Sequence, residues 1–470
     1  MNQTIMADTG GIPDTATKQV KHSFDSMDNN IILDDNQLNA VKAITNTNDN
    51  RDVALMGKAG TGKTTIIKSA IKIMQTNNIK FICIGSTGKA AIAIDGVTAH
   101  SIFNIPLQVL DPHYQLSPFR HNENVILKSD VIIIDEISMM RVDTFHCVME
   151  YITDLEYTYG YRPKIVVVGD FGQLPPVINK DDQPVLQKYY GNKVYAFESL
   201  HWDMFEIVNL STIYRQTDNT WTTLLNNIRQ RHELSETLAT INKRVLLNPT
   251  RNDLVENKMV YLSGTNKQVN NVNSFMLDTI DKTPDTFTAI ISGEGVKPED
   301  CNVEMILTLK AGARVLLTRN NANEGYYNGT TGTYIEQLQV LMGMKYITCL
   351  KVLTDDNKLV TVHPEIFEKK KYVAVETIDE KTGKKKETFE QVVIGSITQF
   401  PVKLGYAMTV HKSQGITVDK VLIDRGNGFF AHGQAYVALS RVKTIEGLAL
   451  SQPLLERDIK VDPIVLQRGF

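Results

Sequence analysis

Runs of consecutive apolar residues recur along the chain, and polar segments and helical patterns follow them. A strand that is covered on both faces has no polar side, so short apolar runs predict central strands of a parallel sheet. Four such runs lie in the first part of the chain, at residues 53–56, 81–84, 131–134 and 165–168. Apolar residues with helical spacing follow the first run, at 66–74. This alternation predicts an α/β domain.

A second α/β unit is predicted further along the chain. Trp221, Leu224, Leu225 and Ile228 are spaced i, i+3, i+4 and i+7, which indicates the core-facing stripe of a helix. Strands are predicted at 259–262, 420–423 and 448–450, and a helix at 434–441. The second unit has no phosphate-loop pattern of its own.

Residues 277–400 differ from the rest, because short alternating runs replace long helical patterns. Alternation with period 2 and intervening turns such as Asn328–Gly329 predict a small antiparallel β-barrel inserted into the second unit. Basic clusters at 369–371 and 384–386 are either solvated hairpin tips or contacts to a nucleic-acid backbone. The predicted units are a disordered tail at 1–30, a first α/β domain at 31–215, a second α/β domain at 216–276 and 401–470, and the β-barrel at 277–400.

Composition narrows the class of protein. The 470 residues are 42% apolar and 22% charged, which is typical of soluble globular proteins. The net charge of −3 argues against binding nucleic acid through a global field, although it leaves room for a local basic groove. The four cysteines are widely scattered, so reduced thiols and an intracellular location are expected. No apolar run is long enough to span a bilayer, so no membrane association is expected.

The first predicted strand leads into the pattern G-x-x-x-x-G-K-T at residues 57–64. Strand, glycine-rich loop and helix together predict a phosphate-binding loop, whose backbone N–H groups and helix N-terminus hold phosphate oxygens. Lys63 can reach the β- and γ-phosphates, and the Thr64 hydroxyl can hold Mg²⁺. The nucleotide-binding candidates in this loop are Gly57, Gly60, Thr61, Gly62, Lys63, Thr64 and Thr65.

Carboxylates and arginines supply the candidate chemistry. Asp135 and Glu136 end a predicted strand, where Asp135 can hold Mg²⁺ and Glu136 can deprotonate the attacking water. Gln173 follows the next strand and is placed to sense the γ-phosphate. Arg215 and Arg441 are the candidates that the second unit would supply to the γ-phosphate, because a guanidinium is always charged and can chelate phosphoryl oxygens. The sequence therefore predicts ATP hydrolysis in a cleft between two units.

Several polar and aromatic residues have two interpretations. Gln37 is either a solvated helix residue or a bidentate partner of adenine. Thr87, Lys89 and His100 follow a strand end, where they either cap turns or grip a phosphodiester backbone. Residues 103–124 are polar and contain three prolines, which suits an excursion from the sheet, such as a short β-hairpin. Its aromatic residues either stack on bases or form a small local core; they are Phe103, Tyr114 and Phe119.

The order of the motifs resembles one family. GKAGTGKTT, STGKAA with TAH, IIIDEISMM, GDFGQLPPV, IYRQ, TVHKSQGITVD and AYVALSRV occur in this order between Gln37 and Arg441. The chain is similar to the superfamily 1B DNA helicases of the Pif-type, RecD and Dda group, and the Pif-type spelling is the most similar. The resemblance implies two RecA-like domains, an inserted barrel of Src-homology type, and an ATP- and Mg²⁺-dependent motor that moves 5′ to 3′ on single-stranded DNA.

The resemblance also implies roles for individual residues. Gln37 would contact adenine and Tyr214 would stack near it, while Gln173, Arg215, Gln414 and Arg441 would surround the γ-phosphate, and Gly415 would also bind the nucleotide. The DNA track would be lined by Thr87, Lys89, His100, Phe103, Phe119, Thr265, Asn266, Thr409 and His411. Residues 103–124 would form the wedge that parts the duplex. Single-stranded and forked DNA are the implied partners of a protein that works as a monomer, and replication or repair proteins are further partners; the implied processes are DNA replication, repair and recombination. The alternative is an ATP-gated nucleic-acid binding or remodelling protein that does not separate strands.

Overall fold

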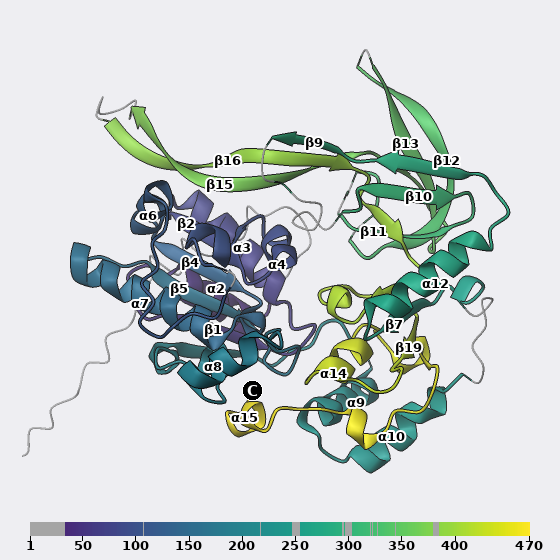
Figure 1. The fold of residues 1–470 in the computed structure, drawn as a ribbon, viewed down its shortest axis with the longest axis horizontal. Coiled ribbons are helices and arrows are strands. Elements are labelled where there is room, and N and C mark those ends of the chain that lie inside the picture. The colour runs from purple at the N-terminus through teal and green to yellow at the C-terminus, as the bar shows by residue number, and fades with distance from the viewer. Residues whose placement is uncertain are drawn as a thin grey trace, which may run out of the picture.

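The computed structural model describes residues 33–106, 108–216, 218–246, 254–293, 296, 303–319, 321, 323–326, 328–343, 345–378 and 385–470. The tail predicted at 1–30 lies outside these residues. Two α/β domains stand side by side, and a β-rich insertion rises from the second one (Figure 1). The predicted α/β class is confirmed.

The first domain is built on a parallel sheet with strand order β3-β2-β4-β5-β1-β6. Its strands are β1 (Val53–Gly57), β2 (Phe81–Gly85), β3 (Val97–Thr98), β4 (Val131–Asp135), β5 (Lys164–Gly169) and β6 (Glu206–Leu210). The four strands predicted from apolar runs are the buried central ones, because only a strand covered on both faces tolerates consecutive apolar residues.

Helices cover both faces of this sheet and create two separate cores. Val53 and Leu55 belong to a core shared with α2 and α3, whereas Ala54 and Met56 belong to a core shared with α7. Successive residues of a strand point to opposite faces, which explains this division. The helices of the domain are α2 (Asp35–Thr45), α3 (Lys63–Thr76), α4 (Gly88–Ala93), α5 (Ala99–Ile102), α6 (Arg120–Leu127), α7 (Val142–Tyr159) and α8 (Asp182–Tyr190).

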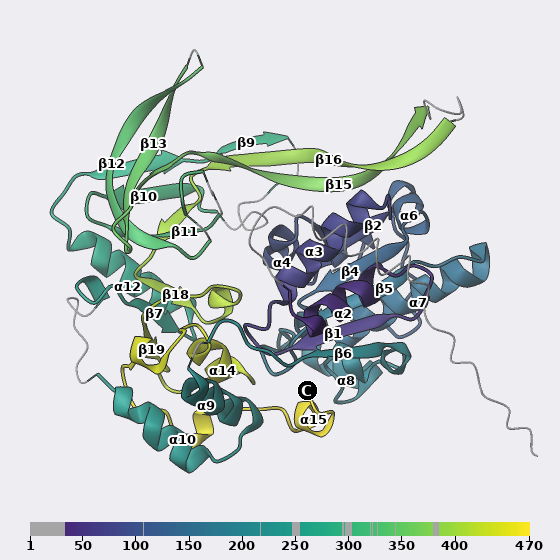
Figure 2. The ribbon, with the colours of Figure 1, turned by 180° about the vertical axis from the view of Figure 1, so that it is seen from behind.

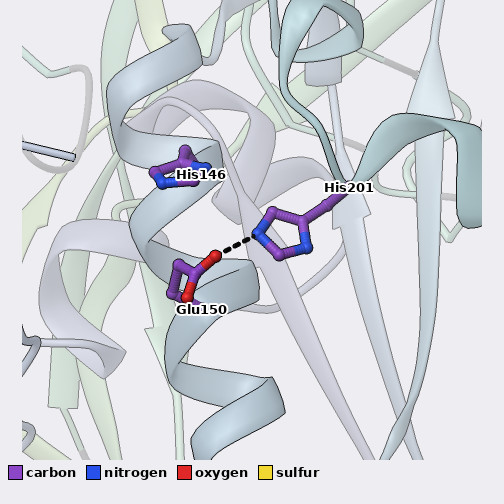
Figure 3. A group of neighbouring side chains, drawn as sticks. All are labelled: His146, Glu150 and His201. Carbon is purple, nitrogen blue, oxygen red and sulfur yellow. Dashed lines mark hydrogen bonds and ion pairs between the residues drawn. The ribbon is translucent and has the colours of Figure 1, made fainter. Parts of the chain in front are cut away.

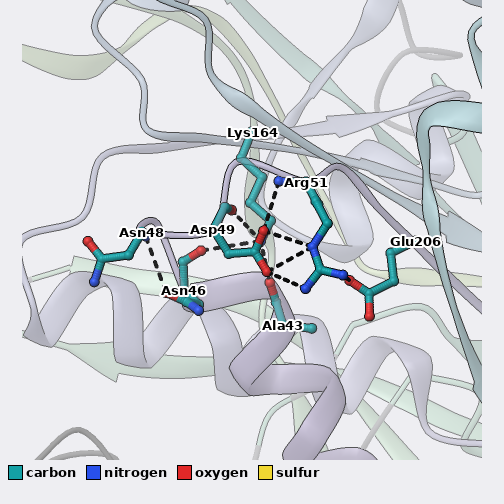
Figure 4. A network of polar contacts seen from close by, with 7 residues as sticks. All are labelled: Ala43, Asn46, Asn48, Asp49, Arg51, Lys164 and Glu206. Carbon is teal, nitrogen blue, oxygen red and sulfur yellow. Dashed lines mark hydrogen bonds and ion pairs between the residues drawn. The ribbon is translucent and has the colours of Figure 1, made fainter. Parts of the chain in front are cut away.

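The C-terminal end of α2 is fixed by a polar network (Figure 4). The buried Lys164 ammonium donates hydrogen bonds to the carbonyls of Ala43, Asn46 and Asp49 at 2.7, 3.2 and 3.1 Å. Carbonyls at a helix C-terminus lack partners within the helix and attract cations. Because Lys164 begins β5, this contact ties α2 to the sheet and so fixes the helix that carries Gln37.

The second domain has a smaller parallel sheet with order β18-β7-β19-β20. Trp221, Leu224, Leu225 and Ile228 are buried in its core, as their spacing predicted. The strands are β7 (Val260–Ser263), β18 (Ala407–Thr409), β19 (Val421–Asp424) and β20 (Leu448–Leu450). The helices are α9 (Asn219–Gln230), α10 (Leu234–Ile241), α12 (Asn266–Asp278) and α14 (Gln434–Leu439).

The insertion consists of antiparallel strands in three sheets, with orders β10-β8, β14-β13-β12-β11-β17 and β15-β16-β9. The prediction of antiparallel strands within residues 277–400 is confirmed. Their bounds are β8 (Pro284–Thr288), β9 (Ile290–Gly293), β10 (Ile306–Lys310), β11 (Arg314–Leu317), β12 (Thr331–Met342), β13 (Lys345–Thr354), β14 (Leu359–Val362), β15 (Glu365–Ile378), β16 (Lys385–Gln399) and β17 (Val402–Leu404).

Strands β15 and β16 form a long hairpin that reaches away from the insertion and over the first domain (Figures 1 and 2). Strand β15 lies against α6 and α5 of that domain. The predicted basic clusters fall on this hairpin; Lys384 is outside the described residues. The insertion therefore contacts both α/β domains.

The prediction of a β-hairpin within residues 103–124 is wrong. The described part of this segment, 103–106 and 108–124, contains no strand and leads into α6. Phe103 is fully buried and packs edge-on against Tyr151 of α7 at 6.0 Å between ring centroids. The stacking of Phe103 on a base is therefore also wrong, and its alternative interpretation as a local core residue holds. Phe119 is 57% exposed, so it stays accessible to a partner.

The end of the chain departs from the predicted domain boundary. Helix α15 (Pro463–Gln467) follows the second domain in sequence, yet Val465 and Phe470 pack into a core of the first domain. Phe470 contacts Phe171 and Phe197, with ring centroids 4.9 and 5.1 Å apart. The chain thus returns to the first domain, where α15 lies below α8 in Figure 1 and Phe470 packs against Phe171, just after the end of β5.

Cys83, Cys147 and Cys349 are buried free thiols, as predicted, whereas Cys301 lies outside the described residues. Among the helices of the described part of the chain, none has the length and apolar character needed to cross a membrane.

Candidate functional site

Strand ends bring most of the predicted site residues to one edge of the first sheet. In a parallel sheet the carboxyl ends of all strands lie at the same edge. The phosphate-loop candidate follows β1, Asp135 ends β4, and Gln173 follows β5. Strand order places β4, β5 and β1 next to each other, so these groups share one cavity of about 1020 Å³.

The loop between β1 and α3 has the backbone of a phosphate cradle. Gly60 and Gly62 both have a φ of +84°, a conformation that side chains disfavour. A side chain at Gly60 would also meet Arg215, whose Cβ lies 2.6 Å from the position of an added Cβ. The Lys63 ammonium donates hydrogen bonds to the Gly57 and Lys58 carbonyls at 2.7 and 3.1 Å. Burial lowers the pKa of Lys63, although nearby carboxylates, Asp170 first among them, oppose this effect.

Two carboxyl groups face this loop from the end of β4. The Asp135 carboxylate accepts a hydrogen bond from the Glu136 backbone N–H at 2.8 Å. Burial, and after it the neighbouring Glu136, raise the pKa of Asp135 to about 7. Glu136 Oε2 is buried and has no hydrogen-bond partner among the described residues. A divalent cation would favour the ionised form of Asp135, so this pair fits Mg²⁺, which takes oxygen ligands.

The second domain contributes Arg441 to the same cavity, and Arg215 lines it from the segment between the two domains. Arg441 is only 1% exposed, and its guanidinium binds the Val437, Ser413 and Ile416 carbonyls at 2.7, 2.9 and 3.2 Å. Burial, and then the positive charge of Arg215, lower the pKa of Arg441 to about 9. Two buried guanidinium groups repel each other, so an anion between them and Lys63 would be stabilised. The cavity therefore fits a polyphosphate.

An ion pair that the sequence did not reveal joins the two domains beside the phosphate loop. Asp170, which follows β5, pairs with Arg229 of α9 at 2.7 Å, and their side chains are 0% and 7% exposed. Asp170 also accepts a hydrogen bond from Gln173 Nε2 at 3.1 Å. Burial raises the pKa of Asp170, but the charges of Arg229 and Lys63 and its hydrogen bonds outweigh burial, so the net shift is downward.

The sequence analysis also did not predict several other contacts across the interface between the two domains. The Ala59 N–H of the phosphate loop donates to the Tyr436 hydroxyl at 3.1 Å, and Lys58 Nζ donates to Asn226 Oδ1 at 2.9 Å. Gly433 approaches so closely that an added Cβ would lie 2.2 Å from the Gln173 carbonyl oxygen. Asp170 and Tyr436 lie within motifs, which is a signal that could have found them; Asn226 and Arg229 lie on an ordinary helix pattern and give none.

The two residues expected at the adenine lie at the entrance to α2. Gln37 Oε1 accepts from the Asp34 N–H at 3.2 Å, and Gln37 Nε2 donates to the Thr61 carbonyl at 3.3 Å. Its carboxamide thus forms a capping box and holds the phosphate loop. Tyr214 is 48% exposed, its hydroxyl binds the Asp34 carboxylate, and its N–H donates to the Gly60 carbonyl at 2.8 Å. Both residues adjoin the loop.

Lys89 does not lie where it was expected. Its ammonium donates to the Lys412 and Gln414 carbonyls of the second domain at 2.8 and 2.5 Å and lines the nucleotide cavity. Burial, and then Arg441, lower the pKa of Lys89 to about 8. In this arrangement of the domains its ammonium is therefore held at the interface of the two domains, and its assignment to a DNA track stays a prediction. Gln414 and Gly415 line the same cavity, as predicted for residues near the γ-phosphate.

The remaining DNA candidates lie in both domains. Thr87 lines the nucleotide cavity, and its hydroxyl accepts from the Ala90 N–H at 3.2 Å as a turn cap. His100 lies on α5, and burial lowers its pKa. In the second domain, neighbouring strand ends carry the other four, because β7 pairs with β18. Thr265 and Asn266 are exposed, Thr409 is buried, and His411 is partly buried.

An exposed aromatic residue that the sequence did not single out lies beside His411. Phe430 is 59% exposed, and its ring stacks on the His411 ring with centroids 6.2 Å apart and an interplanar angle of 18°. The aromatic edge of Phe430 also lies near Gly264, at the end of β7. An exposed aromatic ring such as that of Phe430 suits nucleic-acid bases, which have π-faces of their own. Phe430 lies in an irregular segment, where no periodicity could mark it.

Two α/β domains, one phosphate loop and arginines at their interface define a P-loop ATPase of the two-domain helicase class. A model of the PIF1-like helicase family matches residues 32–243. The ATP-dependent DNA helicase Pif1 of Campylobacter jejuni is 32% identical over 409 residues, which cover 83% of this chain and 86% of that protein. The chain belongs to the PIF1-like helicase family.

Solved structures agree with this assignment. Pif1 from Bacteroides sp in complex with ADP-AlF4 superposes with a TM-score of 0.79 at 28% identity, over 94% of this chain and 97% of that chain. Pif1 from Bacteroides in complex with ADP-AlF3 and single-stranded DNA gives a TM-score of 0.63 at 28% identity, over 94% and 97% of the two chains. The resemblance seen in the motifs is thereby confirmed.

Proposed function

We propose that this protein is an ATP-dependent DNA helicase that moves 5′ to 3′ on single-stranded DNA and unwinds duplexes. One observation carries the proposal: Lys63, Asp135 and Glu136 of one domain line the same cavity as Arg441 of the other, with Arg215 between them. Hydrolysis then depends on the domains being closed, because Arg441 completes the site only from across the interface. Membership of the PIF1-like helicase family supports DNA as the substrate.

The chain's own residues have distinct tasks in this proposal. Glycines of the phosphate loop let backbone N–H groups surround the β- and γ-phosphates, and Lys63 moves from the loop carbonyls to phosphate oxygens. Thr64 and Asp135 would hold Mg²⁺, which neutralises phosphate charge when bound. Glu136 orients the attacking water and takes its proton. Gln173 and Gln414 face the γ-phosphate, and Arg215 and Arg441 stabilise the charge that develops there.

The DNA track is proposed to follow His100 in the first domain and the strand ends with Thr265, Asn266, Thr409 and His411 in the second. The location of these residues supports the proposal, because polar side chains near the edges of the sheets can contact the DNA backbone and Phe430 adds a surface for stacking. We further propose that the insertion closes into a barrel of Src-homology type and that residues 103–124, with exposed Phe119, part the duplex. We also propose that the protein works as a monomer, that it is intracellular, and that its partners are replication or repair proteins.

The test compares the unwinding of two duplexes: one carries only a 5′ single-stranded tail, and the other carries only a 3′ single-stranded tail. We expect ATP to cause strand release only from the 5′-tailed duplex. The Lys63→Ala variant is the control that lacks motor activity. Release from the 3′-tailed duplex alone would contradict the direction. ATP-dependent retention of DNA without strand release from either duplex would favour the alternative, an ATP-gated binding or remodelling protein.

A further inference from the structure

A cluster of two imidazoles and one carboxylate lies on the first domain, and none of its members lines the nucleotide cavity. His146 and Glu150 are one helical turn apart on α7, so they share a face of the helix. His201 precedes the short helix η3 (Trp202–Met204) and faces them (Figure 3). One potential ligand atom from each of the three residues lies within 4.8 Å of the other two.

Hydrogen bonds already orient the side chains of this cluster. His201 Nε2 lies 2.8 Å from Glu150 Oε1. His146 Nε2 lies 3.2 Å from the Pro112 carbonyl oxygen, which can only accept, so this nitrogen carries the proton. The lone pair of the neutral ring is therefore on Nδ1. Ser199 Oγ lies 3.5 Å from that Nδ1 and 3.4 Å from the His201 N–H, so Nδ1 faces the segment that carries His201.

One side of the cluster is open to solvent, and one of its imidazoles is already held in the orientation of a ligand. His201 is 12% exposed and Glu150 is 47% exposed, which leaves one side of the cluster open to solvent. A neutral imidazole held by a backbone carbonyl through its other nitrogen is the usual arrangement of a metal-binding histidine.

We propose that His146 Nδ1, His201 and Glu150 bind one divalent transition-metal ion of the Zn²⁺ class, with water in the fourth position. Nitrogen and carboxylate ligands suit Zn²⁺, Co²⁺ and Ni²⁺, whereas Mg²⁺ and Ca²⁺ prefer oxygen ligands alone. Metal–ligand bonds of ~2.0–2.1 Å put tetrahedral ligand atoms roughly 3.3 Å apart. The observed spacing is brought to this geometry by rotations of side chains, and when His201 Nε2 binds the ion its proton moves to Nδ1 of the same ring.

Such an ion would connect three segments of the first domain. Helix α7 supplies two ligands, the segment before η3 supplies the third, and the Pro112 carbonyl holds the His146 ring from the irregular segment 108–119. The metal would thus stiffen the segment that precedes exposed Phe119. The alternative is a His201–Glu150 ion pair beside a hydrogen-bonded His146, which needs no metal.

The test uses the full chain without an affinity tag, stripped of metal by a chelator and kept in excess Mg²⁺ so that the nucleotide site is occupied. Titration with Co²⁺ should give visible d–d absorption that saturates at one equivalent and disappears when Zn²⁺ is added. His201→Gln and Glu150→Gln should each weaken Co²⁺ binding by more than the roughly 10–100-fold cost of losing an outer-shell partner. His232→Gln is the matched control, because His232 and Glu233 form an exposed pair on the second domain.

The thermal midpoint provides a second measurement. Zn²⁺ should raise the midpoint of the wild type and of His232→Gln, but not that of His201→Gln or Glu150→Gln. Wild-type protein that shows no stoichiometric Co²⁺ absorption at micromolar concentrations would overturn the proposal, even if a variant fails to fold. Wild-type affinity in both His201→Gln and Glu150→Gln would overturn it as well.

Discussion

The buried ion pair between Asp170 and Arg229 should control closure of the two domains. Each domain supplies one partner, and the side chains are 0% and 7% exposed, so solvent screens the pair little. In the Arg229→Met variant, closure would bury the Asp170 carboxylate without its partner. Removing one member of a buried pair costs ~3–5 kcal/mol. At about 1.4 kcal/mol for each factor of ten, the closure equilibrium should fall by roughly a hundredfold to several thousandfold.

The closure equilibrium can be measured by energy transfer between two dyes. Tyr157→Cys on α7 and Lys267→Cys on α12 provide exposed labelling positions in the two domains. Cys83, Cys147 and Cys349 are buried and should label poorly, and Cys301→Ser removes the fourth thiol. Arg229→Met should shift the population toward a larger dye separation and lower the kcat for ATP, because Arg441 no longer reaches the phosphates.

Two further variants separate loss of the ion pair from general damage. Arg231→Met removes an exposed arginine at the end of the same helix and should leave closure unchanged. The double variant Asp170→Leu, Arg229→Met removes both charges, and it should regain much of the closed population because no lone charge is buried. The reasoning is refuted if Arg229→Met closes as readily as the wild type, or if the double variant is more open than Arg229→Met.

Four other changes test the site and the fold. Lys63→Ala should abolish ATP hydrolysis, since the β- and γ-phosphates lose their cation; near-normal turnover would exclude the site. Arg441→Ala should retain ATP binding, measured with a fluorescent analogue, but lose most of kcat; an unchanged kcat would remove Arg441 from the mechanism. Because the pKa of Asp135 is raised to about 7, protons compete with Mg²⁺ below that pH, and the apparent Mg²⁺ affinity in the presence of ATP should fall about fivefold from pH 7 to pH 6; a pH-independent affinity would contradict the assignment. Phe470→Ala should destabilise the protein by about 2 kcal/mol, less than the ~3–5 kcal/mol of a fully buried phenylalanine, as measured by urea unfolding; an unchanged midpoint would show that α15 does not stabilise the first domain.

The local sequence pattern was sufficient to predict those parts of the structure that depend only on neighbouring residues. Residues 131–134 had to form a covered strand, because consecutive apolar β-branched side chains leave no polar face. The phosphate loop was equally predictable, since glycines with positive φ, a lysine and a threonine must follow each other directly. The expected hairpin within 103–124 failed because prolines and polar residues mark an irregular segment without specifying its shape.

Contacts between residues far apart in sequence were decided by how the elements pack together. Whether Phe103 faces a base or a core depends on Tyr151, which lies 48 positions later, and nothing in the local sequence expresses that contact. Lys89 reaches carbonyls of the second domain for the same kind of reason. Neither outcome could be read from residue type, because lysine and phenylalanine serve both alternatives equally well.

The sequence by itself determined the central strands of the first sheet, the phosphate loop, the carboxylates and arginines of the candidate site, and the family. Tertiary structure alone decided that α15 returns to the first domain, that Asp170 meets Arg229, and that His146, Glu150 and His201 converge. The physical reason is that backbone preferences and hydrophobic periodicity act over a few neighbouring residues. Contacts between elements instead depend on how entire surfaces pack against each other.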